Sequence, residues 1–304
     1  MPTFRPRRAG AGAVALATMA LFAPPLVAQQ GPLKIFVSVD MEGIGGIGTG
    51  AMTSTGGKDY GLGRELLTAE VNTVVLAILD RHPDADILVN DSHGDHQNAL
   101  HTLLDPRVTY IQGSIKPLGM VQGLDASFDG VVFVGYHAKA GDPDGFLAHT
   151  GTGSVKGLWL NGVEVGEGGM NAAFAGGYGV PVILAAGDSA ATAELSALLD
   201  TETVTTKTAE TPAAARLIHP TIVRERLADG VRRALDRLGA GGFEPFEVGE
   251  PVTLEMRFAS TTHVDILTSI PGVSKVDGFT VRYTADDADQ AYRLIRLMYR
   301  FIQS

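Results

Sequence analysis

The distribution of apolar residues predicts a chain in which buried strands alternate with helices. A mostly apolar run, LKIFVSV, occupies residues 33–39. Such a run is typical of a strand that is buried on both faces of a parallel sheet. Apolar residues recur at helical spacing across residues 60–81, which predicts a long helix. The same patterns predict further strands at residues 87–89, 108–111, 131–134 and 182–185, and further helical segments near residues 118–124 and 170–178.

This alternation indicates an α/β fold with a doubly wound, mostly parallel sheet. One segment differs, because residues 158–165 alternate around Asn161-Gly162, which is typical of a hairpin turn. After about residue 212 we expect a second, smaller α+β domain, residues 213–304, beside a larger α/β domain of residues 29–212. Its predicted elements are a helix (221–238), a strand (252–258), a short helix (263–267), a strand (279–284) and a closing helix (286–301).

The first 28 residues have a different pattern from the rest. Arg5, Arg7 and Arg8 precede a largely apolar run over residues 11–23, and small residues follow up to Ala28. This layout is typical of a secretory signal peptide, and the run is shorter than the roughly 20 apolar residues of a spanning helix. We expect removal of residues 1–28 and an exported protein, periplasmic or secreted, that does not remain in the membrane. The general secretory and twin-arginine routes both stay open.

The composition narrows the chemistry available to the mature chain. Loss of the three arginines would take the net charge from −10 to −13, because residues 1–28 hold no acidic residue. So acidic a chain is not expected to bind nucleic acid, which requires Lys and Arg to neutralise phosphates. The sequence has no cysteine, which excludes disulfides and thiolate ligands. Any metal ion must therefore be held by His, Asp and Glu.

Four potential metal ligands follow directly after three of the predicted strands. Asp40 and Glu42 follow the first strand. His93 follows the strand at residues 87–89, and His137 follows the strand at residues 131–134. Each residue alone could be a solvated or packing side chain. Because the carboxyl ends of parallel strands lie at one edge of a sheet, where ligands bind, their convergence predicts a functional site.

Two further residues join this set from outside the strands. Glu167 opens a predicted helix, where a carboxylate could equally be a helix cap. His149 lies in a loop rich in Gly, Pro and Asp, residues 142–150. Such a loop could present His149 to a substrate as a general acid or base, or to stabilise an oxyanion, although its position alone favours a loop histidine without a role.

The ligand set indicates its metal. Neutral imidazoles and carboxylates without sulfur suit zinc, with manganese or iron as possible alternatives. Asp40, Glu42, His93, His137 and Glu167 together exceed what one tetrahedral zinc ion takes from a protein. We therefore expect two zinc ions per chain that share a bridging carboxylate, with Asp40 as that bridge.

Residues 43–48 (GIGGIG) also match the glycine pattern of a dinucleotide-binding turn after a strand. Two observations count against that interpretation. Asp40 and Glu42 would place negative charge beside a pyrophosphate. No acidic residue ends a second strand about 20 residues further on, because a helix is predicted there. A nucleotide site remains the weaker alternative.

Five short segments, in this order along the chain, resemble the DppA-type D-aminopeptidases, a family of zinc peptidases. The likeness runs from about residue 33 to the C-terminus and is strongest over residues 33–190. A match of five separate blocks is specific, whereas any single block is not. The blocks are Ser38-Val39-Asp40-Met41-Glu42-Gly43, Asn90-Asp91-Ser92-His93, Gly135-Tyr136-His137-Ala138, Ala148-His149-Thr150, and Val165-Gly166-Glu167 with Asn171-Ala172.

The resemblance implies a binuclear zinc site with Asp40 as the bridge between the ions. Glu42 and His93 would be among the ligands of the pair, and His137 and Glu167 would complete the set. The implied reaction removes an N-terminal D-amino acid, typically D-alanine, from short peptides.

His149 matches the catalytic histidine of that family. The family also implies a closed, ring-like homo-oligomer, a decamer, that shelters the sites in a central chamber. Three features depart from the family pattern: the export signal, a slightly longer loop between His137 and His149, and a second domain that matches less closely. They leave two alternatives open, a metal-dependent amide or ester hydrolase with another substrate and a non-catalytic metal- or ligand-binding protein.

Overall fold

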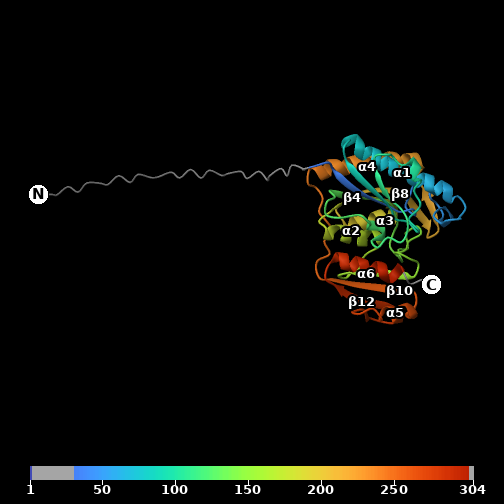
Figure 1. The fold of residues 1–304 in the computed structure, drawn as a ribbon, viewed down its shortest axis with the longest axis vertical. Helices are drawn as coiled ribbons and strands as arrows, with labels where there is room; N and C mark the ends of the chain where they lie inside the picture. The colour runs from blue at the N-terminus through green and yellow to red at the C-terminus, as the bar shows by residue number, and fades with distance from the viewer. Residues whose placement is uncertain (2–30, 301–304) are drawn as a thin grey trace. The chain divides into compact units, whose positions relative to one another are not determined.

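The larger sheet of the protein is mostly parallel. The computed structural model describes residue 1 and residues 31–300, and the chain from Pro32 onward forms one compact unit. The expected signal peptide lies outside the described residues except for Met1. Neighbouring strands pair in parallel except the last two, which are antiparallel. Two strands of this sheet, β4 and β8, are labelled in Figure 1. The sheet order is β3 (Thr109–Ile111), β2 (Asp86–Asp91), β1 (Lys34–Val39), β4 (Gly130–Tyr136), β7 (Val182–Asp188), β8 (Glu202–Thr211) and β9 (Ala214–Leu217).

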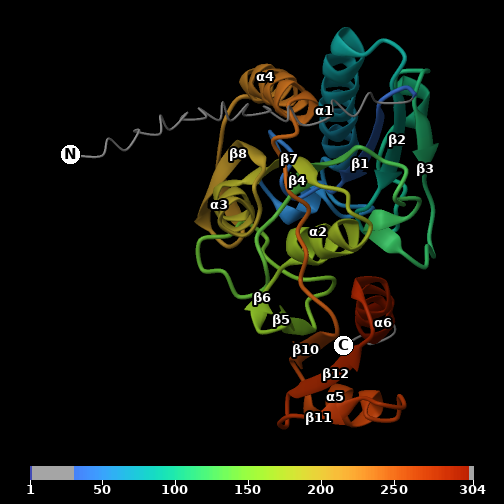
Figure 2. The same ribbon diagram turned by 90° about the vertical axis from the view of Figure 1, so that its left-hand side faces the viewer.

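Helices cover both faces of this sheet, which makes it doubly wound as expected (Figure 2). The alternation along β1 shows the cause, since Ile35 and Val37 join the apolar core under α1 and α4 while Phe36 joins the core on the α2 side. On one face lie α1 (Tyr60–Arg81) and α4 (Pro220–Gly239), and on the other lie α2 (Glu167–Gly177) and α3 (Ser189–Leu198).

A second sheet lies beyond α2. Between the two sits α6 (Ala288–Arg300), which packs on α2 and on the second sheet (Figure 2). Asn171 of α2 bonds the hydroxyl groups of Tyr136 (2.9 Å) and Tyr292 (2.9 Å), and so joins β4 to α6. The sheet order is β11 (Ser274–Lys275), β12 (Thr280–Ala285), β10 (Val252–Phe258), β5 (Val155–Leu160) and β6 (Val163–Glu164), with α5 (Thr261–Leu267) packed on β10 and β12.

The two sheets do not divide the chain where the sequence pattern changes. The expected boundary between residues 212 and 213 falls between β8 and β9, which are paired strands of the first sheet. The hairpin predicted around Asn161-Gly162 is present as β5 and β6, but it pairs with β10 of the second sheet. Each sheet thus takes strands from both sides of that boundary. In the second sheet, β5 of the hairpin pairs with β10 because the apolar residues of both strands belong to one core.

Two other expectations differ from the structure. Residues 118–124 do not form an α-helix but a short 3₁₀ helix, Gly119–Val121, because Gly119 and Gly123 adopt positive φ angles of 46° and 96°. The elements α3, β8 and β9 follow one another between residues 189 and 217, where no element was anticipated. The β8 strand matters for the site, since it carries a buried lysine described below.

Candidate metal centre

The first cluster of potential ligands forms where β1 and β2 end. Asp40 and Glu42 follow β1, and His93 lies just beyond β2. The Nδ1 atom of His93 is 3.1 Å from Asp40 Oδ1 and 3.0 Å from Glu42 Oε2. The two carboxylates are almost fully buried. One atom from each of these residues lies within 4.8 Å of the others, a spacing that a single metal ion could span.

The second cluster adjoins the first and comes from three different kinds of segment. His137 follows β4, Glu167 is the first residue of α2, and His149 lies in the loop that leads to β5. His137 Nε2 is 3.5 Å from Glu167 Oε2, and His149 Nε2 is 3.6 Å from Glu167 Oε1. The imidazoles of His137 and His149 stack with centroids 4.1 Å apart. Asp40 connects the clusters, because its Oδ2 atom lies 3.4 Å from His137 Nε2.

All three imidazoles are oriented in the same way. Each ring has one nitrogen against a main-chain carbonyl, which can only accept, so that nitrogen must carry the proton. The other nitrogen of each ring faces the carboxylates, and there a neutral ring would offer its lone pair to a metal ion. The carbonyl contacts are His93 Nε2 to Thr53 O (2.8 Å), His137 Nδ1 to Ala138 O (2.9 Å) and His149 Nδ1 to Leu147 O (2.8 Å).

The electrostatics of this arrangement demand a cation. Asp40 Oδ2, Glu42 Oε2 and His137 Nε2 are buried and have no hydrogen-bond partner among the described residues. Burial, and then the charge of Glu42, raise the pKa of Asp40 to about 6. Burial alone would lower the pKa of His93, but the carboxylates of Glu42 and Asp40 raise it well above its usual value. Buried acceptors that face one another are costly without a cation between them, and this donor set suits zinc.

The segment that carries Asp40 and Glu42 is fixed by close backbone contacts. Gly43 N donates to Gly135 O at 2.7 Å, and Asp40 N donates to Val134 O at 2.8 Å. A Cβ atom on Gly135, which has a φ angle of 76°, would come within 2.3 Å of Asp40 O. Only glycine allows this approach of the β4 end to the β1 end.

A buried lysine, which the sequence analysis did not single out, holds the other side of this segment. Lys207 of β8 is fully buried, and its ammonium group donates to the carbonyl oxygens of Glu42 and of Ile47, the latter at 2.7 Å. Burial lowers the pKa of Lys207 to about 7. Glu70 of α1 accepts from Gly45 N at 2.8 Å, so both charged groups support the glycine-rich turn. The sequence signal that could have revealed Lys207 is its place within ETVTTKTAET, a stretch that alternates as a strand does.

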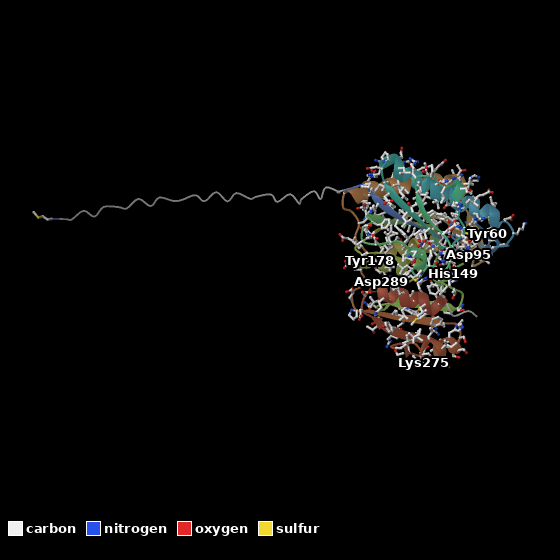
Figure 3. The ribbon with its side chains drawn as sticks, in the orientation of Figure 1. Tyr60, Asp95, His149, Tyr178, Lys275 and Asp289 are labelled. Atoms are coloured by element: carbon white, nitrogen blue, oxygen red, sulfur yellow. The ribbon has the colours of Figure 1, made fainter. Side chains whose placement is uncertain are left out.

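The two clusters open into one cavity of about 310 Å³. Asp40, His93, His149 and Glu167 line it, and so do residues from α6, which lies far away in the sequence. Asp95, which is labelled with His149 in Figure 3, also lines the cavity. The side chain of His149 is 30 % exposed, whereas that of His137 is 1 % exposed. His149 is thus the histidine of the second cluster that a substrate in the cavity can reach. Arg296 and Tyr299, both from α6, were not anticipated as site residues.

The remaining histidines lie apart from the clusters. His96 is buried and its Nδ1 atom bonds Asp91 O at 2.8 Å, whereas His101 is exposed. His219 caps α4 by accepting from Thr221 N at 3.2 Å, and His263 packs beside Phe258. The structure therefore brings together all six residues singled out in the sequence: Asp40, Glu42, His93, His137, His149 and Glu167.

Comparisons with known proteins give the family. The profile of the D-aminopeptidase family matches residues 33–297. The chain is 32 % identical over 268 residues to a D-aminopeptidase of Bacillus subtilis (strain 168). This alignment covers 88 % of this chain and 96 % of the relative. Among solved structures, it is similar to the Zn-dependent D-aminopeptidase DppA from Bacillus subtilis, described as a self-compartmentalizing protease. That match has a TM-score of 0.85 and 31 % identity, over 90 % of this chain and 100 % of the other. This chain belongs to the D-aminopeptidase family of peptide-bond hydrolases.

Proposed function

We propose that this chain binds two zinc ions, one in each cluster, and releases N-terminal D-amino acids, D-alanine above all, from short peptides. One observation carries the proposal: two adjoining clusters of buried carboxylates and oriented imidazoles share Asp40 and open into one cavity. The similar solved structure is described as Zn-dependent, which supports zinc over manganese or iron.

In this proposal Asp40 would hold both ions, since its carboxylate lies between His93 and His137. Glu42 and His93 complete the first site, and His137 and Glu167 belong to the second. The ions, when bound, would polarise the scissile carbonyl group and lower the pKa of a water molecule. The protein contributes the orientation of the ligands, through the carbonyl contacts of the imidazoles and the rigid turn after β1.

His149 is the residue that moves a proton or stabilises charge on the substrate. Its Nδ1–H is held by Leu147 O, so the Nε2 atom is the one that acts. Its partial exposure and its position in the cavity let Nε2 reach a substrate, while stacking on His137 fixes the plane of the ring. In this role His149 Nε2 first accepts a proton from the attacking water, and the imidazolium so formed stabilises the developing oxyanion and then transfers that proton to the leaving amine.

Export and assembly are further parts of the proposal. The basic and then apolar start of the sequence supports cleavage near Ala28 and a periplasmic or secreted enzyme. No helix of the described residues has the length and apolar character needed to cross a membrane. The self-compartmentalizing description of the similar structure supports a closed homo-oligomer, for which a ring-like decamer is the specific proposal.

The test is hydrolysis of D-alanyl-glycine and L-alanyl-glycine by the mature chain, with metal content measured by mass spectrometry. We expect about two zinc ions per chain and release of alanine from the D-peptide alone, abolished by chelation and restored by zinc. Hydrolysis of other amides or esters but of neither peptide would favour a different substrate. Bound zinc without turnover of any such compound would favour a binding protein.

A further inference from the structure

The wall of the cavity that comes from α6 carries a positive charge without a matching acid. Arg296 lines the cavity and is 7 % exposed. Its guanidinium group donates to the hydroxyl group of Tyr299 and, at 3.3 Å, to Lys116 O. Its Nε atom is buried and has no hydrogen-bond partner among the described residues. Both groups that it reaches are neutral, so Arg296 makes no direct ion pair through these contacts.

A second buried cation is Lys116, whose main-chain oxygen Arg296 contacts. The Lys116 ammonium group donates to Asn90 Oδ1 at 2.6 Å and to Asp91 O, again two neutral acceptors. Within residues 31–300, no carboxylate oxygen of Asp or Glu lies within 4.0 Å of the side-chain nitrogens of either cation. Arginine and lysine are almost never buried without a paired charge. Arg300, half-buried at the rim of the same cavity, adds a third cation.

The fold makes specific room for this basic side, which we define as Lys116, Arg296 and Arg300. A Cβ atom on Gly119, at a φ angle of 46°, would come within 2.3 Å of Arg296 Cζ. A Cβ atom on Gly151, at a φ angle of 72°, would come within 2.8 Å of the Tyr299 ring. Two glycines of the α/β layers therefore admit two α6 side chains to the cavity. Gly151 also donates to Glu167 Oε1 at 2.6 Å, which couples this wall to the metal cluster.

We propose that Arg296, assisted by Arg300, binds the C-terminal carboxylate of the peptide substrate. This inference rests on the proposed function and adds to it a rule of selection. A free peptide is an anion at one end, and the carboxylate would supply the acceptor that Arg296 Nε lacks and the charge that the basic side lacks. The metal clusters and Arg296 line one cavity, so the scissile bond and the carboxylate of one short peptide fit it together. An extended residue spans only about 3.5 Å, so the site selects for short chains.

The test compares D-alanyl-glycine with D-alanyl-glycinamide, which differ only in the C-terminal charge. In the zinc-loaded enzyme we expect kcat/KM for the free acid to exceed that for the amide by about 10- to 100-fold, the value of one or two charge-assisted hydrogen bonds. Arg296→Gln should remove that preference, with little change for the amide. Arg296→Lys should restore part of it, and Arg300→Gln should weaken it by less.

Arg293→Gln is the matched control, because Arg293 lies on the same helix but is exposed and paired with Asp289 at 2.5 Å. It should leave both kcat/KM values unchanged. Equal losses for acid and amide in Arg296→Gln, with an unchanged melting temperature, would overturn the proposal and indicate a role in the reaction itself. Equal rates for acid and amide in the wild-type enzyme would overturn it as well.

A binding measurement separates this proposal from the proposed function. Titration calorimetry of the metal-free protein with the same two peptides should show tighter binding of the acid by about tenfold or more, lost in Arg296→Gln. If the wild-type enzyme hydrolyses neither peptide but keeps that preference in binding, the aminopeptidase function fails and the carboxylate site stands. If the peptides are hydrolysed without any preference for the acid in rate or in binding, the aminopeptidase function stands and the carboxylate site fails.

Discussion

His93 and His96 are three residues apart in one loop, yet they belong to opposite sides of the same cavity. His93 faces Glu42 and Asp40, and these carboxylates raise its pKa well above the usual value although burial opposes the shift. His96 faces the basic side, and burial followed by the charge of Lys116 lowers its pKa to about 4. The cavity is therefore strongly polarised over a short distance.

The metal side of the cavity consists of Asp40, Glu42, His93, His137 and Glu167. The difference in charge between this side and the basic side shows how the site can orient a substrate. Among the described residues, the metal side has buried acceptors that lack donors, and the basic side has one buried donor, Arg296 Nε, that lacks an acceptor. Each side is incomplete by itself, and each requires a partner of opposite charge. A metal ion satisfies one side and an anionic group satisfies the other, so a short peptide has one favoured direction in the cavity.

The largest effect should follow the loss of Asp40, which contacts both clusters. Asp40→Asn leaves His93 and His137 in place but removes the charge between them, so we expect loss of both ions. Turnover should fall by about 10³-fold or more, since bound metal contributes several kcal/mol to catalysis. Metal content and kcat on D-alanyl-glycine measure this. Asp95→Asn is the control, an exposed carboxylate in the same cavity. Two retained ions in Asp40→Asn would rule out the bridging role.

A smaller loss should follow replacement of His149, the exposed member of the second cluster. His149→Ala should keep both ions, because Asp40, His137 and Glu167 remain, but turnover should fall about 10²-fold. His101→Ala, at an exposed histidine away from the cavity, should change neither. Loss of one ion from His149→Ala, detected by mass spectrometry, would make His149 a ligand and not the residue that acts on the substrate.

The metal side was predictable from sequence because its ligands are local to strand ends. A buried parallel strand is recognisable by its apolar run, and the residue that follows it must lie at the carboxyl edge. Asp40, His93 and His137 were found in this way, and the doubly wound sheet follows from the same runs. Glu167 and His149 lie on a helix start and in a loop, where position alone is ambiguous. Glu167 and His149 could be predicted as site residues only in combination with the strand-end ligands and the resemblance to the family.

The basic side was not predictable by these means. Arg296 lies on an amphipathic helix where a charged residue normally indicates solvent, and only the packing of α6 on α2 brings it to the cavity. Lys207 and β8 were missed because a strand of ETVTTKTAET has few apolar residues to mark it. The pairing of β5 with β10 could not be predicted for a similar reason, since strands that lie far apart in the sequence leave no local signal of their pairing.

Metal removal should also destabilise the fold, because it leaves the buried carboxylates of the metal side facing one another. Each ion present at about 100 times its dissociation constant stabilises a protein by about 2.7 kcal/mol. For a chain of this size, each ion then corresponds to about 5 to 10 °C in melting temperature. Calorimetry with and without a chelator measures the change. Asp40→Asn should show no such difference, and an equal difference in that variant would place the stabilising ion elsewhere.

The smallest effect tests the basic side through His96. Its pKa is lowered from 6.5 to about 4 in the folded protein, so the unfolded chain binds more protons between those values. The stability contributed by neutral His96 is present above pH 6.5 and is lost as the pH falls through that window. Between pH 7 and pH 5 the free energy of unfolding should therefore fall by about 1 to 2 kcal/mol more in the wild-type protein than in His96→Gln, measured by urea denaturation of the metal-free forms. The same comparison in an Arg296→Gln background should give a smaller difference, because one of the charges that oppose protonation of His96 is gone. An unchanged difference would mean that Arg296 does not contribute to the lowered pKa of His96, which burial and the charge of Lys116 would then account for.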